Sequence, residues 1–427
     1  MRGSSLVGRE KIQRRSASKV SFMILLVGTA LVLLTNPPGI NSHEPITTNI
    51  RFNKEVVRIF QRHCLACHGA EGVTNVSLST YATARPWAKA FKEEVLEKRM
   101  PPFQAVKGFG SFHDDYALTQ QEIDQLVAWV EGGVPKGDDK DVPELNSSEW
   151  RLGPPDLILT PKGHAADSPA DSDSYRCLSV ATNLKTPRWV TAVDFVPANQ
   201  VAVHCAAFEV APANTQLASD HADSCGREMD AAAERLGLWL PGQAEVRSPA
   251  YEGRLLRAGA RITIRIHYRK GADLTSSPGK LGLYFSRRTL RRSVRTLTLA
   301  GAGEEIPAGA TSHRVVVNYT LPETTKAISI RPLLFPFAKS VEVTAHRPDG
   351  TTEVLIWARD YRYDWQPEYN FKTSPLLPKD TQIEVVGYLD NSDDNLNNPN
   401  HPAKTIRFAA PLCELTISDV LIMGAKR

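Results

Sequence analysis

A short cysteine motif constrains this chain more than any other feature of its sequence. Residues 62–72 read RHCLACHGAEG, in which Cys64 and Cys67 are two residues apart and His68 follows directly. A redox-active dithiol needs a surrounding βαβ pattern, which the flanking sequence lacks. A zinc site needs two more ligands, and no second cysteine pair follows within 100 residues. Covalent haem attachment uses every residue, because the two thiols bond the vinyl groups and the histidine ligates the iron.

The sequence around the motif predicts a small helical domain. Residues 52–61 (FNKEVVRIFQ) and residues 87–98 both carry apolar side chains at helical spacing. Thr119 and Glu122 have the spacing of a capping box that opens an apolar helix over residues 123–130. A haem motif between such helices resembles a small c-type cytochrome domain, which we place at residues 50–138 with one haem c.

Met100 is the predicted sixth ligand of the iron. It is the only methionine between residues 24 and 228, and it stands in KRMPPF. Pro101 and Pro102 cannot continue a helix, so they predict a loop that can hold a thioether over the haem face. His63 and His113 are the alternative ligands. Ligation by His68 and Met100 favours electron transfer over catalysis, because it closes the iron to outside ligands.

The N-terminus has the layout of an export signal. Six basic residues precede residues 20–34 (VSFMILLVGTALVLL), which are almost wholly apolar. We assign residues 1–42 as either a cleaved signal or a retained membrane anchor. Both alternatives predict an exported, periplasmic protein, and the second would anchor it to the inner membrane through residues 20–34.

Four cysteines remain outside the haem motif: Cys177, Cys205, Cys225 and Cys413. In an oxidising compartment they could form two disulfides, and the sequence does not choose among the three connectivities. The net charge of +4 is close to neutral for 427 residues and gives no case for nucleic-acid binding.

Beyond a polar, proline-bearing linker at residues 139–160, the pattern changes to short strands. Gly, Pro, Asn and Asp clusters separate the apolar or alternating runs, which are 189–195, 201–210, 261–268, 315–319, 341–345, 354–358 and 382–389. Such spacing favours antiparallel sandwiches or jelly rolls. We expect a multidomain protein: a small all-α cytochrome c domain, then two all-β domains at residues 161–300 and 301–427.

Several segments in order resemble a known family. They are RMPPF, LTQQEIDQLVAWVEGGVPKGD, WRLGPPDLIL, YRCLSVATNL, RWVTAVDFVP, LPGQ, RLLRAGARITIRIHY, YRYDWQPEY and LDNSDDNLNNPNHP. Together they are similar to bacterial exported proteins that join a cytochrome c domain to a copper type II, ascorbate-dependent monooxygenase-like domain, related to peptidylglycine and dopamine monooxygenases. The resemblance runs from about residue 50 to residue 425. It implies two jelly-roll domains with one copper each, which hydroxylate C–H bonds with O₂.

The copper ligands that this resemblance implies are largely replaced. The His-His pair of the first site falls on His204 and Cys205, and its third histidine should fall in residues 329–343, which contain none. At the second site His267 is kept, but Arg269 stands at the other histidine position and Leu412 at the methionine position. His204, Cys205 and His267 are therefore weak copper candidates, and ordinary strand residues are the alternative interpretation.

The sequence thus predicts an exported c-type cytochrome that exchanges single electrons with a redox protein or a membrane electron-transfer complex. Its β domains would be a monooxygenase scaffold without copper that docks partners or builds an assembly. This interpretation does not decide whether the protein is an enzyme, although it favours a protein without catalytic activity, and it assigns no catalytic residue. The alternatives are a haem-fed copper monooxygenase and a structural haem-bearing subunit.

Overall fold

The computed structural model describes most of the chain beyond residue 46. The described residues are 47–69, 74–103, 105–113, 117–144, 149–161, 174–210, 234–243, 247–249, 251–269, 278–288, 290, 292–301, 303–333, 337–359, 365–408 and 411–419. The predicted export segment and Cys225 lie outside this set. Among the helices within it, none has the length and apolar character needed to span a membrane.

The N-terminal part is helical, as the sequence predicts. Its elements are η1 (Phe52–Val56), α2 (Val57–His63), α3 (Leu65–His68), α4 (Tyr81–Ala84), η2 (Arg85–Trp87), α5 (Ala88–Leu96), α6 (Gln120–Glu131) and η3 (Asp139–Asp141). The predicted capping box is confirmed, since Thr119 Oγ1 accepts from the Glu122 backbone and Glu122 accepts from the Thr119 backbone. Aromatic rings form the core, with Trp129 5.8 Å from both Phe52 and Phe91.

Eight strands then form a first β sandwich. They are β1 (Leu157–Leu159), β2 (Ser174–Ala181), β3 (Arg188–Val196), β4 (Val203–Val210), β5 (Glu234–Trp239), β6 (Glu252–Leu256), β7 (Arg261–Tyr268) and β8 (Lys280–Phe285). One layer has the order β2-β7-β4-β5, and the other has the order β1-β8-β3-β6. Alternate residues of β7 point into the shared core, where Ile262, Ile264 and Ile266 are fully buried.

The remaining strands form a second β sandwich. They are β9 (Arg292–Ala300), β10 (Glu304–Ile306), β11 (Ala310–Thr320), β12 (Thr325–Pro332), β13 (Ala338–His346), β14 (Thr352–Arg359), β15 (Tyr369–Asn370), β16 (Leu376–Leu377), β17 (Gln382–Asn391), β18 (Ile406–Phe408) and β19 (Pro411–Asp419). One layer has the order β11-β17-β13-β14, and the other contains β9, β19, β12, β15 and β16. A short parallel pairing of β6 with β9 joins the two sandwiches into one continuous sheet.

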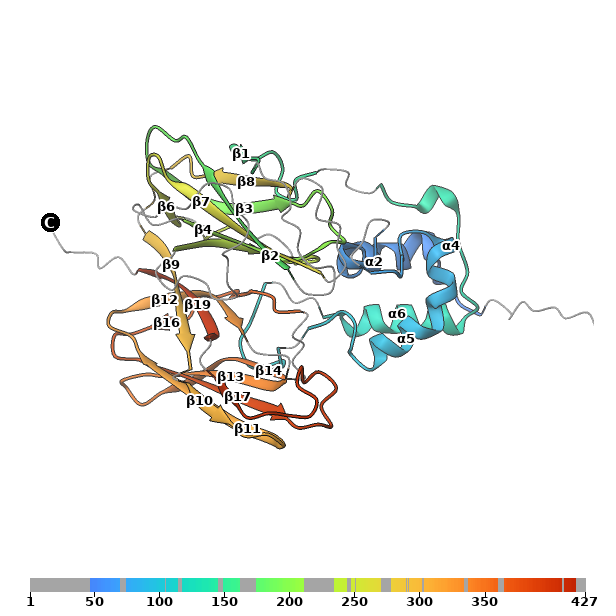
Figure 1. The fold of residues 1–427 in the computed structure, drawn as a ribbon. Helices are drawn as coiled ribbons and strands as arrows, with labels where there is room; N and C mark the ends of the chain where they lie inside the picture. The colour runs from blue at the N-terminus through green and yellow to red at the C-terminus, as the bar shows by residue number, and fades with distance from the viewer. Residues whose placement is uncertain are drawn as a thin grey trace, which may run out of the picture.

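The strands cross two of the predicted boundaries. Strand β1 falls within the predicted linker and pairs with β8, because its apolar Leu157 and Leu159 pack on the first core. Strand β9 precedes residue 301 but pairs with β19 of the second sandwich. Figure 1 shows the helices beside the two sandwiches, with α2 next to the first and the chain after α5 running toward the second.

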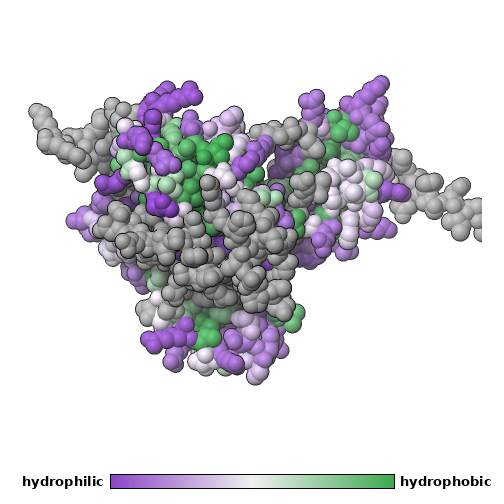
Figure 2. Space-filling model, turned by 45° about the horizontal axis from the view of Figure 1, so that its top comes forward, coloured by the Kyte–Doolittle hydropathy of each residue, from purple (hydrophilic) through white to green (hydrophobic). Residues whose placement is uncertain are grey.

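Charged side chains also connect the two sandwiches. Arg235 on β5 forms an ion pair with Glu414 on β19, and Arg331 on β12 lies 3.4 Å from the same carboxylate. A cavity of about 310 Å³ lies at this contact and is lined by these three residues together with Arg254 and His113. On the outside, large exposed apolar residues such as Trp87, Tyr251 and Leu396 are scattered over all three parts. The face in Figure 2 shows hydrophobic and hydrophilic side chains next to one another.

Candidate haem and metal sites

The haem motif occupies one tight helical turn. Cys64 ends α2, and its carbonyl accepts hydrogen bonds from the backbone of Cys67 at 3.1 Å and of His68 at 2.8 Å. Both cysteines are half-buried and have free thiols. Two thiols one turn apart, followed by an imidazole, are therefore presented together, as covalent haem attachment requires.

The two thiols are neutral near pH 7 in the unloaded chain. Burial raises the pKa of Cys64 to about 12, with further increases from Cys67 and Glu122. Burial also raises the pKa of Cys67 to about 11, although the guanidinium of Arg269 opposes the increase. The chain thus holds both sulfur atoms in the thiol form, in a partly apolar environment that suits the edge of a porphyrin.

The His68 imidazole is oriented for iron ligation. Its Nδ1 lies 2.9 Å from the carbonyl oxygen of Val76 and 2.9 Å from Thr74 Oγ1. A carbonyl can only accept, so Nδ1 carries the hydrogen and the lone pair is on Nε2. A hydrogen bond from the ring nitrogen that does not bind the metal is the usual support of a metal-bound imidazole. The residues present therefore fit a haem held by Cys64, Cys67 and His68.

The three candidates for the sixth ligand differ in their surroundings. Met100 is half-buried just after α5, and its backbone donates to the Glu94 carbonyl at 3.1 Å. His63 Nε2 lies 3.2 Å from the carboxylate of the buried Glu122. His113 lines the cavity between the sandwiches, and its backbone donates to the Asn370 carbonyl at 2.8 Å. Because His63 contacts Glu122 and His113 lines the cavity between the sandwiches, Met100 stays the predicted ligand.

The haem motif meets the first sandwich through a few close contacts. Cys67 Sγ lies 3.7 Å from the Pro241 carbonyl, and Gln200 Nε2 lies 3.5 Å from the Ala66 carbonyl. Gly242 has a φ of +81°, and a Cβ there would lie 2.7 Å from Cys67 Sγ. A hollow of about 750 Å³ lies beside these contacts and is lined in part by Ala66, Gln200 and Gly242. No local signal marks Gly242 for this role, because Cys67 is 175 positions away in the sequence.

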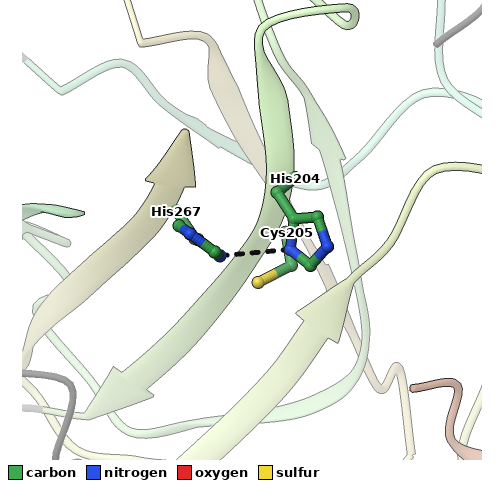
Figure 3. A group of neighbouring side chains, drawn as sticks. All are labelled: His204, Cys205 and His267. Carbon is green, nitrogen blue, oxygen red and sulfur yellow. Dashed lines mark hydrogen bonds between the residues drawn. The ribbon is translucent and has the colours of Figure 1, made fainter. Parts of the chain in front are cut away.

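The three copper candidates lie together rather than in two places. The resemblance assigned His204 and His267 to separate sites, but their Nδ1 atoms are 3.1 Å apart. That assignment is wrong, because β4 and β7 are neighbours and Cys205 pairs with His267 across them. One ligand atom from each of His204, Cys205 and His267 lies within 4.8 Å of the others. Figure 3 shows the three side chains converging from the two strands.

A bulge in β4 makes this convergence possible. Successive side chains of a regular strand point to opposite faces, so His204 and Cys205 would normally diverge. The pairing with β7 shifts register between Val203 and Cys205, and such an irregularity re-aims a side chain. On the other side of β7, Tyr175 of β2 stacks its ring on the His267 imidazole, with 4.3 Å between the ring centroids, and so fixes its orientation.

The thiol of Cys205 is free and half-buried, with three guanidiniums near it. Burial raises its pKa, and the guanidiniums of Arg331, Arg235 and Arg269 oppose that increase. Arg269 thus carries the positive charge that the sequence predicts beside the candidate donors, and it acts on Cys205 and Cys67 alike. Thiolate formation at Cys205 would be helped by these cations or by a bound metal.

Trp365 connects this cluster with the haem motif. It is buried in a small apolar cluster with Ala207, Leu238 and Leu240, and Cys205 packs against that cluster. A methyl group at Gly242 would lie 3.5 Å from Trp365 Cη2 as well as 2.7 Å from Cys67 Sγ. Gly242 is therefore close to both the Cys67 sulfur and the Trp365 indole, and Cys205 packs against the cluster that contains this indole.

The remaining cysteines settle part of the disulfide question. Cys177 is disulfide-bonded, whereas Cys205 and Cys413 are free. Two disulfides among the four cysteines are therefore excluded. Cys413 is fully buried in the second core, and burial raises its pKa.

Comparison with known proteins identifies one part of the chain. Residues 54–133 match the family model described as Cytochrome c. This part is a cytochrome c domain. It carries covalent haem and supports electron transfer, as the motif predicts. No match was found among curated proteins.

Solved structures give only distant similarity. A structure of allantoicase is 10% identical, with 58% of this chain and 80% of that chain covered, at a TM-score of 0.18. A structure of the infectious bursal disease virus Gx strain is 9% identical, covering 63% and 72%, at a TM-score of 0.20. A Paenibacillus xanthan lyase is 11% identical, covering 65% and 28%, at a TM-score of 0.17. Scores this low carry no argument about fold or function.

Proposed function

We propose that this protein is an exported, periplasmic c-type cytochrome that carries one haem c and transfers single electrons. His68 and Met100 ligate the iron, and a redox protein or a membrane electron-transfer complex is the partner. The two sandwiches are jelly rolls of a monooxygenase scaffold that serves docking or assembly rather than hydroxylation. The observation that carries the proposal is the haem motif, in which the Val76 carbonyl holds the hydrogen of His68 on Nδ1 and leaves the Nε2 lone pair for the iron.

The first test is covalent attachment. Protein purified from a host that exports and matures cytochromes should keep one haem per chain through denaturation and acid-acetone extraction. The double variant Cys64→Ala, Cys67→Ala should retain none, because both thioether bonds are lost. Cys413→Ala is the matched control and should keep the full amount. Haem that extracts freely from the natural protein would refute the proposal.

A second candidate function rests on the cluster of His204, Cys205 and His267. The expectation that copper is not retained assumed two separate sites, and the cluster removes that assumption. Two imidazoles and a thiolate are a donor set used by electron-transfer copper sites, whereas oxygen-activating sites keep open positions among histidines. Bound copper would supply a second one-electron centre, held by His204, Cys205 and His267. This candidate is a haem-linked copper oxidoreductase.

Copper analysis after loading and dialysis distinguishes the two candidates. Substoichiometric copper, with unchanged haem oxidation and reduction in His204→Ala and His267→Ala, supports the cytochrome without a second centre. One copper per chain that disappears in His267→Ala and Cys205→Ser supports the linked centre. A thiolate-to-copper absorption band that is lost in Cys205→Ser would identify the sulfur as a ligand. His346→Ala, on an exposed strand end, is the matched histidine control.

A further inference from the structure

The loop that follows Met100 packs on the second sandwich. Val106 donates to the Trp357 carbonyl at 2.7 Å, and Lys372 donates to the Ser111 carbonyl at 2.8 Å. Ala105 forms a bridge with Ala358, and Phe112 forms one with Phe371. We call Phe103 together with residues 105–113 the seat segment. Its backbone is hydrogen-bonded to β14 and to the chain after β15, more than 240 positions away in sequence.

Side chains of the seat segment complete the core of the second sandwich. Ala105 and Phe112 are buried within it. The ring of Phe112 lies 5.2 Å from that of Tyr369 and 5.1 Å from that of Phe371. The ring of Phe103 lies 5.7 Å from Tyr369. Burial of this kind fixes the segment's position, because a large aromatic side chain contributes several kcal/mol to packing, about 3–5 when it is removed.

Only a short, stiff link separates the seat segment from Met100. Met100 is held on its N-terminal side, where its backbone donates to the Glu94 carbonyl at the end of α5. Pro101 and Pro102 follow, and each has a restricted φ. Phe103, the next residue, already packs on the second core. The position of the Met100 side chain is therefore set jointly by α5 and by the second sandwich.

The haem motif is held by a different support. Cys67 and Ala66 contact the first sandwich at Pro241 and Gln200. We propose that the second sandwich positions Met100 for the iron through the seat segment, with Phe112 as the main positioning residue. Each sandwich thereby holds one side of the haem ligation, and the proposal rests on Met100 being the sixth ligand. With haem bound, a shift of the seat segment would withdraw the Met100 sulfur, whereas His68 and the bonds from Cys64 and Cys67 do not depend on that segment.

The test compares Phe112→Ala with Phe408→Ala. Phe408 is a buried phenylalanine of the same core, but its ring lies against Gly301. In the oxidised natural protein the near-infrared sulfur-to-iron band should be present. Phe112→Ala should lose most of that band, lower the haem potential and bind carbon monoxide, with covalent haem retained. Phe408→Ala should keep the band at a similar loss of stability.

The outcomes separate this proposal from the ligation on which it rests. A natural protein without the band would refute Met100 as ligand and the positioning proposal with it. A natural protein with the band that Phe112→Ala leaves intact would refute positioning alone. Equal loss of the band in both phenylalanine variants would also refute it, since the effect would then be general destabilisation. Phe112→Leu keeps most of the apolar volume and, should Phe112→Ala fail to fold, must show a partial loss of the band.

Discussion

The first sandwich meets the cytochrome domain through a few contacts at the haem motif, whereas the second sandwich takes a whole segment of it into its core. At the first contact, Cys67 and Ala66 approach Pro241, Gln200 and Gly242 beside a hollow of about 750 Å³. At the second, buried aromatic rings and several backbone hydrogen bonds hold Phe103 and residues 105–113.

The difference indicates two kinds of interface. Buried apolar area provides most of the free energy of association, so the second contact should carry most of the attachment. The first contact consists of a few polar approaches and one close glycine, so it should contribute little to stability. Predictions that compare the two contacts can confirm or reject this division.

The largest expected effect is on the free energy of unfolding. Phe112→Ala should lower it by about 3–5 kcal/mol, because the ring is buried against two other rings. Gln200→Ala, at the first contact, should change it by less than about 0.5 kcal/mol, since it removes one hydrogen bond of 3.5 Å. Denaturant titration of both variants measures the two values. Similar values would mean that the two contacts are energetically alike.

Haem attachment could be predicted from the sequence because Cys64, Cys67 and His68 lie within five consecutive residues of one helical region. The same holds for the helices: a capping box at Thr119 and the apolar spacing of residues 52–61 are local signals. Strand β7 was predicted with its full extent for a similar reason, since it alternates between buried and half-buried residues.

The cluster of His204, Cys205 and His267 could not be predicted from such local signals. His204 and His267 are 63 positions apart, and their contact depends on the pairing of β4 with β7 and on a bulge at His204. Neither the register nor the bulge leaves a mark in residue types. The resemblance placed His204 with Cys205 at one copper site, but it placed His267 at the other.

The seat segment shows a second limit of local signals. Pro101 and Pro102, just before it, predict a loop, and the chain does leave helical structure after α5. That Ala105 and Phe112 are core residues follows only from β14 and β15, which lie hundreds of positions later. Apolar residues in a loop gave the only available signal, and the alternation that marks a strand is missing.

The next effect concerns the first contact alone. Gly242→Ala and Gly259→Ala both place a Cβ at positive φ, at +81° and +69°, and share a backbone strain of about 1–2 kcal/mol. A Cβ at Gly259 meets nothing within 4 Å, whereas one at Gly242 lies 2.7 Å from Cys67 Sγ. We expect Gly242→Ala to be less stable than Gly259→Ala by about 1–3 kcal/mol.

Gly242→Ala should also leave the sulfur-to-iron band in place, because the seat segment and not the first sandwich holds Met100. Denaturant titration and optical spectra of the two variants check both statements. Equal stabilities would show that the haem motif does not rest on Gly242. Loss of the sulfur-to-iron band in Gly242→Ala would place both sides of the haem ligation on the first sandwich.

The smallest effect tests a group that neither sandwich holds. Burial raises the pKa of Glu122, but hydrogen bonds from Thr119 and the neighbouring His63 outweigh burial, so the pKa lies below its usual 4.5. A carboxylate with a lowered pKa stabilises the folded state above pH 4.5, and this contribution is lost as the pH falls through the folded pKa. Glu122→Gln should therefore cost about 0.3–1 kcal/mol at pH 7, because the charge at the start of α6 is lost. The deficit relative to the natural protein should shrink below pH 4.5, whereas the exposed Glu131→Gln should show almost none at any pH. Unfolding measured from pH 7 to pH 3 decides this, and a deficit that grows toward low pH would contradict it.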